Sequence, residues 1–518
     1  MSQIKVISIE QSRLLDKRTI EQKYVSSESL IERAGFQIAK VIAKICREKN
    51  YSDRILLIAG KGNNGGDVFA AADCLYSFGF KPEIITVCAF NDIRNESLIF
   101  YNKVKDLNIN ITESLKIDHF NKLINTFAGD IIVDGILGTG FKPPISDFYK
   151  ALISELNKSK YHIISIDIPS GMSDFPANNK YATDDCVKAS ATISIGSVKS
   201  CFLKKENMPF TGKIYPVNIG FPKIIINELK SNMDIYLEND FEETFKKRKI
   251  DSHKGTYGHT LLVGGAFGFS GAIALCAKGA LHSGSGLITV LCEESSRTII
   301  HSSINEVMTK DLNDIFSESF SADINSDKKF QAICIGPGLG TDSSKLKILD
   351  FFLKNGNQPL VLDADALNLI SLNKISLKEF SRDIILTPHP GEAARLLDCK
   401  VEDIEHNRFE SARLLSEKYN ACIVLKGTHT LVCKNDKFIV HLTGTPAMAS
   451  GGMGDVLAGI ISSLIGQGYN SFDASNIGVF LHGKTAEILE LKRGPFGLGA
   501  GEVAYHLPET VKNFKKFS

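Results

Sequence analysis

Several kinds of segment that mark particular protein classes are missing from this chain of 518 residues. No apolar run is long enough to cross a bilayer. The first residues, MSQIK, lack the apolar core of a secretion signal. An excess of charge is also missing, because 60 basic residues stand against 59 acidic ones. We therefore expect neither a membrane nor a nucleic acid as a partner.

Cysteine pairs with the spacing of metal ligands are missing as well. The 11 cysteines are scattered, and no two of them form a C-x-x-C motif. This usage is typical of reduced thiols in a cytoplasmic enzyme, rather than of disulfides or a zinc site. No repeat of fixed period occurs either, so no solenoid is predicted.

The chain is too long for one ordinary hydrophobic core, and its pattern predicts two α/β domains, residues 1–225 and 226–518. In both halves, short apolar runs alternate with helical patterns, which is typical of parallel β-α-β units. The runs that predict strands are 54–59, 84–89, 131–134 and 163–168, then 261–264, 287–291, 332–335, 360–362, 384–386 and 422–425. The patterns that predict helices are 27–46, 67–78, 147–157 and 271–282.

The first strand of the first half leads into GKGNNGGD, residues 60–67. This segment contains G-x-G-x-x-G between a strand and a helix, as in a dinucleotide phosphate loop. The acid that such a site needs at the end of the next strand is missing, because Glu83 lies at that strand's start. Asn63 and Asn64 offer amide oxygens instead, so the turn also suits a hard cation.

Two further strand ends in this half carry an acid, Asp134 and Asp167. A single aspartate at a strand end usually bonds only to its own loop. In open parallel sheets, however, ligands bind beyond the carboxyl ends of the strands. Because loop 60–67 reaches the same edge, we expect all three features to converge on one crevice.

The second half contains TPAMASGGMGDVLAG, residues 445–459, which continues as an apolar helical pattern ending near Leu464. The free N–H groups at a helix start, together with the helix dipole, form an anion site. Near a phosphoryl group, Asp455 would take the proton of the attacking hydroxyl. The alternative is an ordinary helix cap, in which aspartate is common.

The first half resembles the NAD(P)HX epimerase family over roughly residues 4–220. The resemblance rests on NNGGD at 63–67, on Asp134 with LGTG at 137–140, and on DIPSG at 167–171. It implies a Rossmann-like domain with a parallel sheet that interconverts the R and S forms of hydrated NADH and NADPH, with Asp167 as the acid/base residue. It also implies K⁺ at Asn64, Asp134 and Ser170. The implied substrate contacts are Asn63, Asn64, Gly65, Gly66, Asp67, Gly138, Thr139, Gly140, Phe141, Lys142, Pro143, Pro144 and Asp167.

Two departures from that family leave another hypothesis open. Val68 stands where the family has a glycine, and MSDF at 172–175 replaces its usual continuation after Gly171. The first half could therefore be a binding or assembly module without epimerase activity.

The second half resembles the ADP/ATP-dependent NAD(P)HX dehydratase family, which has a ribokinase-like α/β fold, over about residues 235–510. The motifs that carry the resemblance are HKGTYG at 253–258, GFSGA at 268–272, GPGLG at 336–340, DADALN at 363–368, TPHPGE at 387–392, KGTHT at 426–430 and the segment around Asp455. The resemblance implies that Asp455 starts a transfer of phosphate from ADP to the hydrated ring, after which elimination returns NADH or NADPH, with AMP and phosphate as products.

The same resemblance implies the ligands of this domain. Mg²⁺ would bridge the phosphates, and the acids Asp363 and Asp365 either help to hold it or serve the fold. The implied substrate contacts are Ala272, Gly338, His389 and Asp455. The implied nucleotide contacts are Lys426, Gly427, Thr428, His429, Thr430 and Gly454.

The sequence thus predicts a fused repair enzyme of the cytoplasm that acts on NADHX and NADPHX with ADP, and we expect a homo-oligomer. The main alternative is a ribokinase-type kinase of small molecules fused to a non-catalytic nucleotide-binding module, because the glycine-rich loop with Asp455 would serve such a kinase equally well. His389 within residues 387–392 and the fused first half argue against the kinase.

Overall fold

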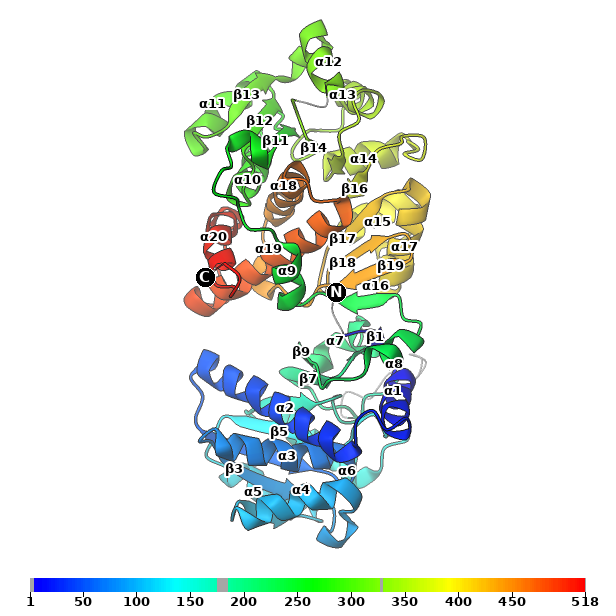
Figure 1. Cartoon of the computed structure of the whole chain (residues 1–518), viewed down its shortest axis with the longest axis vertical. Coiled ribbons are helices and arrows are strands. Elements are labelled where there is room, and N and C mark those ends of the chain that lie inside the picture. The colour runs from blue at the N-terminus through cyan, green and yellow to red at the C-terminus, as the bar shows by residue number, and fades with distance from the viewer. Residues whose placement is uncertain (1–3, 175–184, 327–328, 518) are drawn as a thin grey trace. The chain divides into compact units, whose positions relative to one another are not determined.

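The computed structural model describes residues 4–174, 185–326 and 329–517. The chain forms two compact units, and the division falls between Asp234 and Ile235 (Figure 1). Among the described residues, no helix combines the length and the apolar character needed to cross a bilayer.

The first unit is built on a seven-stranded sheet in the order β4-β3-β2-β5-β6-β7-β9, and every paired strand in it is parallel. The chain runs outward from β2 to β4 and then returns to place β5 on the other side of β2. The carboxyl ends of β2 and β5 therefore flank the point at which the strand order reverses, where open sheets bind ligands. Its strands are β2 (Arg54–Ala59), β3 (Lys81–Thr86), β4 (Asn110–Glu113), β5 (Ile131–Gly135), β6 (His162–Ile166), β7 (Ala191–Ile195) and β9 (Lys213–Val217), and β1 (Val6–Ile7) pairs separately with β8 (Val198–Lys199).

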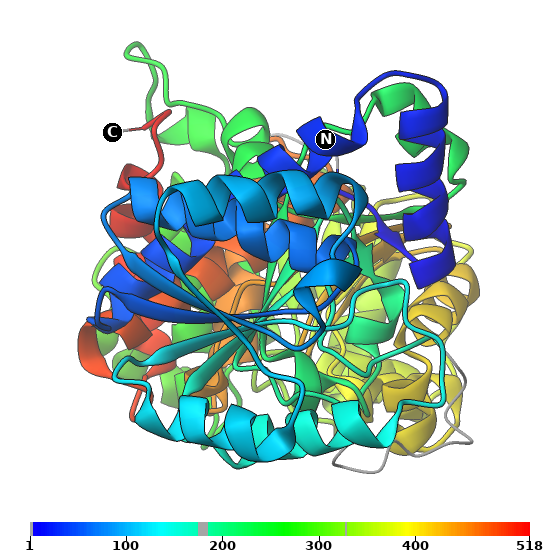
Figure 2. The same cartoon turned by 90° about the horizontal axis from the view of Figure 1, so that it is seen from below.

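Helices cover both faces of this sheet (Figure 2). Along β2, Ile55 and Leu57 face a core shared with α2, α3 and α4, whereas Leu56 and Ile58 face a core shared with α5 and α6. This alternation follows from the two-residue period of a strand, and it explains why the strands are apolar throughout. The helices are α1 (Ile9–Glu21), α2 (Ser27–Lys49), α3 (Asn63–Ser77), α4 (Asn95–Asp106), α5 (Ile117–Thr126), α6 (Asp147–Lys158), α7 (Met208–Thr211) and α8 (Lys223–Glu228).

The helix after β2 begins earlier than its pattern predicts. Helix α3 starts at Asn63 rather than at Asp67, so residues 63–66 form its first turn and not a loop. The apolar period does not reveal this turn, because the sequence there is NNGG. Close contacts of its glycines hold this turn instead: a Cβ at Gly65 would be 1.9 Å from the Gly60 carbonyl oxygen, and one at Gly66 would be 2.7 Å from the Ser97 hydroxyl.

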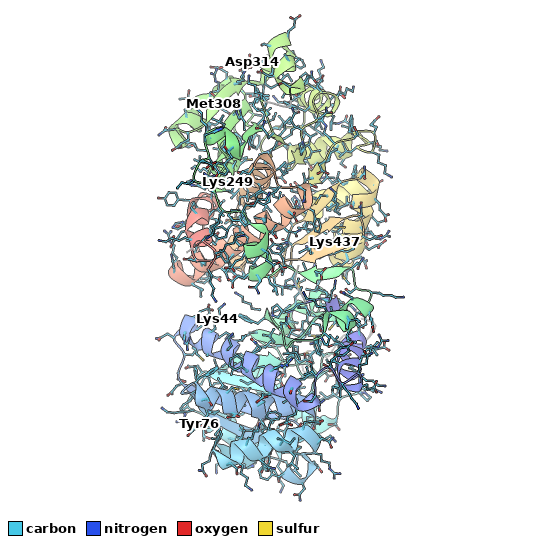
Figure 3. The ribbon with its side chains drawn as sticks, viewed as in Figure 1. Lys44, Tyr76, Lys249, Met308, Asp314 and Lys437 are labelled. Carbon is cyan, nitrogen blue, oxygen red and sulfur yellow. The ribbon has the colours of Figure 1, made fainter. Side chains whose placement is uncertain are left out.

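The second unit is built on a ten-stranded sheet in the order β10-β19-β18-β17-β16-β15-β14-β11-β12-β13. The strands from β17 to β13 are parallel, and β18 and β19 are added antiparallel. Met308 begins the edge strand β13 and Lys437 begins β19 (Figure 3). Here too the order reverses once, between β11 and β14. The strands are β10 (Met233–Ile235), β11 (His259–Val263), β12 (Leu287–Cys292), β13 (Met308–Asp311), β14 (Ala332–Ile335), β15 (Leu360–Leu362), β16 (Ile384–Leu386), β17 (Cys422–Leu425), β18 (Leu431–Lys434) and β19 (Lys437–Val440).

Helices α10 and α18 pack against each other almost backbone to backbone. A Cβ at Gly279 would collide with the carbonyl oxygen of Val456, and one at Gly459 would collide with that of Cys276. The two helices run in the same direction, so both begin at the carboxyl ends of the strands. The helices of this unit are α9 (Glu238–Thr244), α10 (Ser270–His282), α11 (Glu294–Ser303), α12 (Glu318–Asn325), α13 (Ser343–Lys354), α14 (Asp365–Leu372), α15 (Pro390–Leu397), α16 (Val401–His406), α17 (Arg408–Tyr419), α18 (Met453–Gly466), α19 (Ser471–Arg493) and α20 (Ala500–Lys512).

Two candidate active sites

In the first unit, an oxygen-rich cluster lies where β5 and β6 end beside the start of α3. The buried carboxylate of Asp134 accepts hydrogen bonds from the Ser165 hydroxyl at 2.8 Å and from both the amide and the hydroxyl of Ser170, the amide at 3.0 Å. Burial raises the pKa of Asp134, although these hydrogen bonds oppose the shift. Asn64 is buried nearby, and a Cβ at Gly138 would be 3.2 Å from its side chain. The structure therefore brings Asn64, Asp134, Gly138 and Ser170 together.

Asp167 follows β6 in a strained turn. Its φ of +64° is left-handed, and the Ile168 amide donates across it to the Ile166 carbonyl at 2.8 Å. Such γ-turns are rare and strained, and strain of this kind gathers at functional sites. The carboxylate accepts a hydrogen bond from the Ile195 amide at 3.3 Å. It also forms an ion pair with Lys199, whose side chain is fully buried.

Helix α1 brings a further acid to this place. The carboxylate of Asp16 is near enough to Asp167 and Lys199 for their charges to act on it. Burial, and then the charge of Asp167, raise the pKa of Asp16 to about 7. The charges of Asp167, Asp16 and Lys199 also act on Asp67, in the first turns of α3. Burial is again the main reason why the pKa of Asp67 is raised.

Sequence reasoning missed Asp16 and Lys199. Asp16 lies in a helix with many exposed charged residues, and Lys199 lies in the short apolar strand β8, so neither forms a local motif. The one available signal was a lysine inside an apolar run, since a lysine is almost never fully buried without a partner.

The predicted substrate loop forms the outer wall of this site. A turn closes where the Phe141 amide donates to the Gly138 carbonyl at 3.0 Å, and Arg13 of α1 donates to the Phe141 carbonyl at 3.4 Å. Beyond the turn, Lys142, Pro143 and Pro144 are exposed, as is Gly140, whereas Thr139 is half-buried.

The first departure from the family pattern is packed inside the fold. Val68 is fully buried, and its side chain occupies the space that a Cβ at Gly135 would need. It therefore points into the sheet rather than toward a ligand. In segment 172–175, Asp174 accepts a hydrogen bond from the Ile9 amide at the start of α1, and Phe175 lies outside the described residues.

In the second unit, five neighbouring parallel strands, β17-β16-β15-β14-β11, end along one rim. The motifs predicted from the sequence follow these strand ends in spatial order. Lys426 follows β17, His389 lies beyond β16, Asp363 follows β15, and Gly338 lies beyond β14. Helix α18 begins above this rim with Met453.

Lys426 is the charged centre of the rim. Its ammonium donates to Asp363 at 2.8 Å and lies 3.7 Å from Glu392. Asp363 is 1% exposed and also accepts from the Thr387 hydroxyl at 2.7 Å. Burial would lower the pKa of Lys426, but the charges of Asp363 and Glu392 outweigh it and raise that pKa. Lys426 therefore stays charged.

Asp455 lies in the first turn of α18, beside this pair. A Cβ at the preceding Gly454 would be 3.1 Å from the Lys426 ammonium, so only glycine leaves this approach free. Burial, and then the negative charge of Asp363, raise the pKa of Asp455 to about 7, and Lys426 opposes the shift. A carboxylate that titrates near neutral pH at a helix start has the properties of a general base.

The remaining predicted contacts surround this centre. Gly338, with φ of +58°, approaches helix α10 so closely that a Cβ there would be 2.7 Å from that of Phe269 and 3.2 Å from that of Ala272. His389 caps α15 through the Gly391 amide at 3.0 Å, and burial followed by Lys426 lowers its pKa, which favours its neutral form. Asp365 accepts from the Gly340 amide at 2.8 Å, which is a structural role.

The loop after Lys426 is held by a buried arginine. The Arg408 guanidinium donates to the Lys426 carbonyl and, at 3.1 Å, to the Leu425 carbonyl. Thr430 closes the loop through its hydroxyl and the Gly427 carbonyl at 2.9 Å. His429 has a left-handed φ of +54°, and burial followed by Arg408 lowers its pKa to about 4. Gly427 and Thr428 are exposed at the rim.

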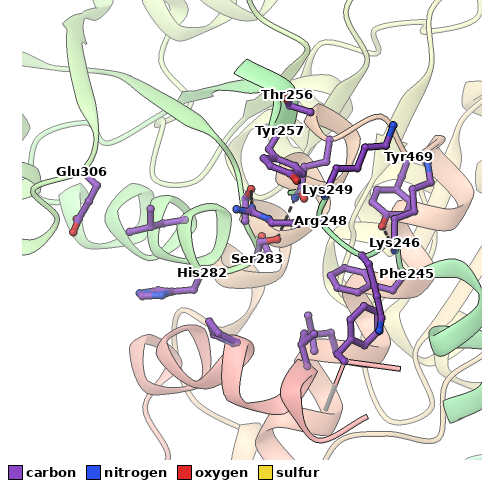
Figure 4. A pocket seen from close by; sticks show the side chains of 18 residues that line it. Phe245, Lys246, Arg248, Lys249, Thr256, Tyr257, His282, Ser283, Glu306 and Tyr469 are labelled. Carbon is purple, nitrogen blue, oxygen red and sulfur yellow. Dashed lines mark hydrogen bonds between the residues drawn. The ribbon is translucent and has the colours of Figure 1, made fainter. Parts of the chain in front are cut away.

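A cavity of about 960 Å³ in the second unit lies away from this rim, where α10 and α18 end (Figure 4). It is lined by the basic run 246–249, and two of these cations, Lys246 and Arg248, already have partners. Arg248 donates to the Gly284 carbonyl and stacks on Tyr257, and the Lys246 ammonium lies 4.7 Å from the centre of the Tyr469 ring. Cations at helix carboxyl ends are stabilising, so the run serves the fold.

Comparison with known proteins gives this architecture a family. Residues 260–509 match the family described as NAD(P)H-hydrate dehydratase, and residues 27–201 match the one described as YjeF-related protein N-terminus. A crystal structure of ADP/ATP-dependent NAD(P)H-hydrate dehydratase from Bacillus subtilis, co-crystallised with ATP and Mg²⁺, is similar to the second unit. Its TM-score is 0.50 at 31% identity, and the match covers 54% of this chain and 99% of that one.

Full-length relatives contain both units. The bifunctional NAD(P)H-hydrate repair enzyme Nnr of Moorella thermoacetica is 30% identical over 509 residues, which cover 97% of this chain and 96% of that protein. The enzyme of the same name from Escherichia coli K12 is 31% identical over 487 residues, covering 93% and 89%. This chain therefore belongs to the family of bifunctional NAD(P)H-hydrate repair enzymes.

Proposed function

We propose that the first unit interconverts the R and S forms of hydrated NADH and NADPH, and that the second unit returns the S form to NADH or NADPH at the expense of ADP. The observation that carries the proposal is the position of Asp455, at the start of α18, beside the ion pair of Lys426 and Asp363. This arrangement offers a proton acceptor and a phosphate-binding helix start in one place. The alternative of a kinase fused to a non-catalytic module is not favoured, because the relatives that span both units are named repair enzymes.

In the second unit, Asp455 takes the proton of the ring hydroxyl as its oxygen attacks the β-phosphorus of ADP. The bond from that phosphorus to the bridging oxygen breaks, and AMP leaves. The amides of Met453 and Gly454, free at the helix start, stabilise the negative charge on the phosphoryl oxygens. Loss of phosphate and of one ring proton then restores the double bond of NADH or NADPH.

The nucleotide brings the need for a divalent ion. Asp363 and Asp365 already accept hydrogen bonds from Lys426 and Gly340, and the described residues contain no cluster of three or more metal-ligating side chains. This fits Mg²⁺, which usually keeps its waters and is bound mainly through substrate phosphates. When bound, Mg²⁺ would neutralise the charge of the phosphates. Asp363, which lies beside Asp455 and Lys426, could accept hydrogen bonds from the water molecules on the ion.

The cluster around Asp134 fits potassium in the first unit. Its donors are the Asp134 carboxylate, the Ser170 hydroxyl and the Asn64 amide, all of which can supply oxygen. The Asn64 amide nitrogen is buried without a hydrogen-bond partner, so this amide can turn its oxygen toward a cation. A bound K⁺ would tie the start of α3 to the ends of β5 and β6, next to Asp167.

We assign the remaining ligand contacts from the positions of the family motifs in this sequence. We assign the hydrated ring in the second unit to Ala272, Gly338 and His389, and the nucleotide to the loop 426–430. In the first unit, loop 138–144 and the first turns of α3 face the substrate. Because NADH and ADP are metabolites of the cell interior, we place the activity in the cytoplasm, and light scattering would test the expected homo-oligomer.

The test is to give purified protein the separated R and S forms of hydrated NADH, with ADP or ATP, Mg²⁺ and K⁺, and to follow the return of NADH absorbance. Recovery from both forms supports both activities. Recovery from S alone would leave the first unit as a non-catalytic module, and consumption of nucleotide only with small alcohols would support a kinase. Asp455→Ala should stop dehydration, and Asp167→Ala should stop epimerisation alone.

A further inference from the structure

Lys199 is the most deeply buried cation of the first unit. Its side chain is 0% exposed, and its ammonium donates to Asp167, to the Ile195 carbonyl at 3.3 Å and to the Ser197 carbonyl at 3.4 Å. All three N–H groups therefore have an acceptor. A charge removed from water this completely is unfavourable unless it is paired, and here its ionic partner is the acid/base candidate of the site.

The turns that hold this pair are strained on both sides. Asp167 has a left-handed φ of +64°, and Gly196 has one of +68°, with the Ser197 amide donating to the Ile195 carbonyl at 2.7 Å. A Cβ at Gly196 would collide with the ring of Phe221, so this second turn requires glycine. Two adjacent strained turns thus aim one carboxylate and one ammonium at each other.

Asp16 reaches the same place from another element. The Ser12 hydroxyl of α1 contacts the Ser197 hydroxyl at 3.3 Å, which fixes this face of the helix against the loop after β7. Asp16 lies four residues later and therefore on the same face of α1. The charges that act on it come from Asp167 and Lys199.

We propose that Asp16 and Asp167 form the acid–base pair of the epimerase site, with Lys199 as the positioning residue that holds the Asp167 carboxylate in place. This inference rests on the proposed epimerase activity. Burial raises the pKa of Asp16, whereas Asp167 is held by direct contact with the Lys199 ammonium. Asp67 of α3 faces the same groups and burial raises its pKa too, so three carboxyl groups share this site. Acids that differ in their surroundings within one site are a recurring device of enzymes.

The chemistry of the substrate requires such a pair. Hydration of NADH places a hydroxyl on a ring carbon bonded to nitrogen, and inversion of that carbon breaks one bond and re-forms it on the opposite face. Asp16 protonates the hydroxyl, the carbon–oxygen bond breaks, water leaves, and the nitrogen lone pair forms a carbon–nitrogen double bond. The Asp167 carboxylate stabilises this cation. Water then adds to the other face as it gives a proton to Asp167, and one proton passes from Asp167 to Asp16 through solvent, so no oxidant or further reactant is needed.

The experiment follows conversion of the pure R form to the S form by chromatography, in K⁺ and without nucleotide, from pH 5 to 9. Three variants of the full chain are compared with wild type: Lys199→Met, Lys199→Arg and Asp16→Asn. Dehydration of the S form with ADP by the same preparations reports whether the protein is folded. Lys5→Met is the matched control, because it removes a half-buried ion pair with Asp234 next to β8.

We expect Lys199→Met to lower the epimerisation rate at pH 7 at least 100-fold, because the Asp167 carboxylate is then no longer held in place. Lys199→Arg keeps a cation beside Asp167 and should recover at least tenfold of that loss. Asp16→Asn should cost at least 10-fold and remove the alkaline limb. Dehydration of the S form should be unchanged in all variants, and Lys5→Met should epimerise normally.

A rate in Lys199→Arg as low as that in Lys199→Met would reduce Lys199 to a structural role and overturn the proposal. So would a wild-type rate and profile in Asp16→Asn. Failure of the underlying function would look different, because wild-type protein would then convert the R form no faster than buffer does.

Discussion

Replacement of Asp455 by asparagine should make the second unit more stable while it stops dehydration. The carboxyl has a pKa of about 7 against 3.8 for an ordinary aspartate, mainly because it is buried. A shift of about three units corresponds to about 4 kcal/mol between its two protonation states. Because the folded pKa is the higher one, ionisation opposes folding. The cost is absent below about pH 4, grows up to about pH 7 and is complete above that.

Asparagine never ionises, so Asp455→Asn should relieve this cost only where it exists. For a unit of this size, about 4 kcal/mol corresponds to a rise in Tm of about 8 °C. We expect that rise at pH 8, and only about a quarter of it at pH 4.5. Thermal unfolding of the full chain measures it, and the transition of the first unit serves as an internal reference, since this unit lacks the substitution.

The matched control is Asp350→Asn, which changes an exposed aspartate of α13 that pairs with Lys354 at 2.8 Å. A surface pair of this kind is worth only a few tenths of a kcal/mol. This control should therefore change Tm little at either pH. An equal rise for Asp455→Asn at both pH values, or a fall at pH 8, would refute the reasoning, because the stabilisation would then not come from the removed ionisation.

Four further predictions concern the same two sites. The acid limb of kcat/KM for dehydration should lie near pH 7, the pKa of Asp455, and a limb near pH 4 would contradict this assignment. Gly454→Ala places a methyl group 3.1 Å from the Lys426 ammonium and should lower kcat for dehydration about tenfold without affecting epimerisation, as steady-state assays of both reactions would reveal. Asp134→Asn should abolish the rise in Tm that K⁺ gives the first unit, and an unchanged rise would place the cation elsewhere. Gly459→Ala drives a methyl group into α10 and should destabilise the second unit by about 1–3 kcal/mol, measured by thermal unfolding.

Much of the architecture could be predicted because both sheets are buried on both faces. The strands are then continuous apolar runs, and β2, β5 and β14–β17 are found where such runs predict them. Two of the strands that escaped prediction have a physical reason. The edge strand β4 is NITE and only half-buried, and β9 contains a proline, so neither forms an apolar run.

In the two sites, some residues stand in local sequence motifs, whereas others come together only through the fold. Asp455 and Lys426 stand in glycine-rich motifs at strand ends, and a motif is visible in sequence. Asp16 and Lys199 are separated by more than 180 residues and meet only because α1 packs against the loop after β7. No local pattern encodes such a meeting. The early start of α3 escaped because its first turn is NNGG, and contacts with Gly60 and Ser97, rather than an apolar period, hold that turn.

The parallel course of α10 and α18 has an electrostatic consequence. Each helix carries about half a positive charge at its beginning, so the two together present about one charge to the rim. Dipoles aligned side by side repel each other, and the glycine contacts at Gly279 and Gly459 hold them in place against that repulsion. Unlike the carboxylates around it, this backbone charge cannot titrate. The rim should therefore still bind nucleotide in mild acid, after proton transfer to Asp455 has already failed.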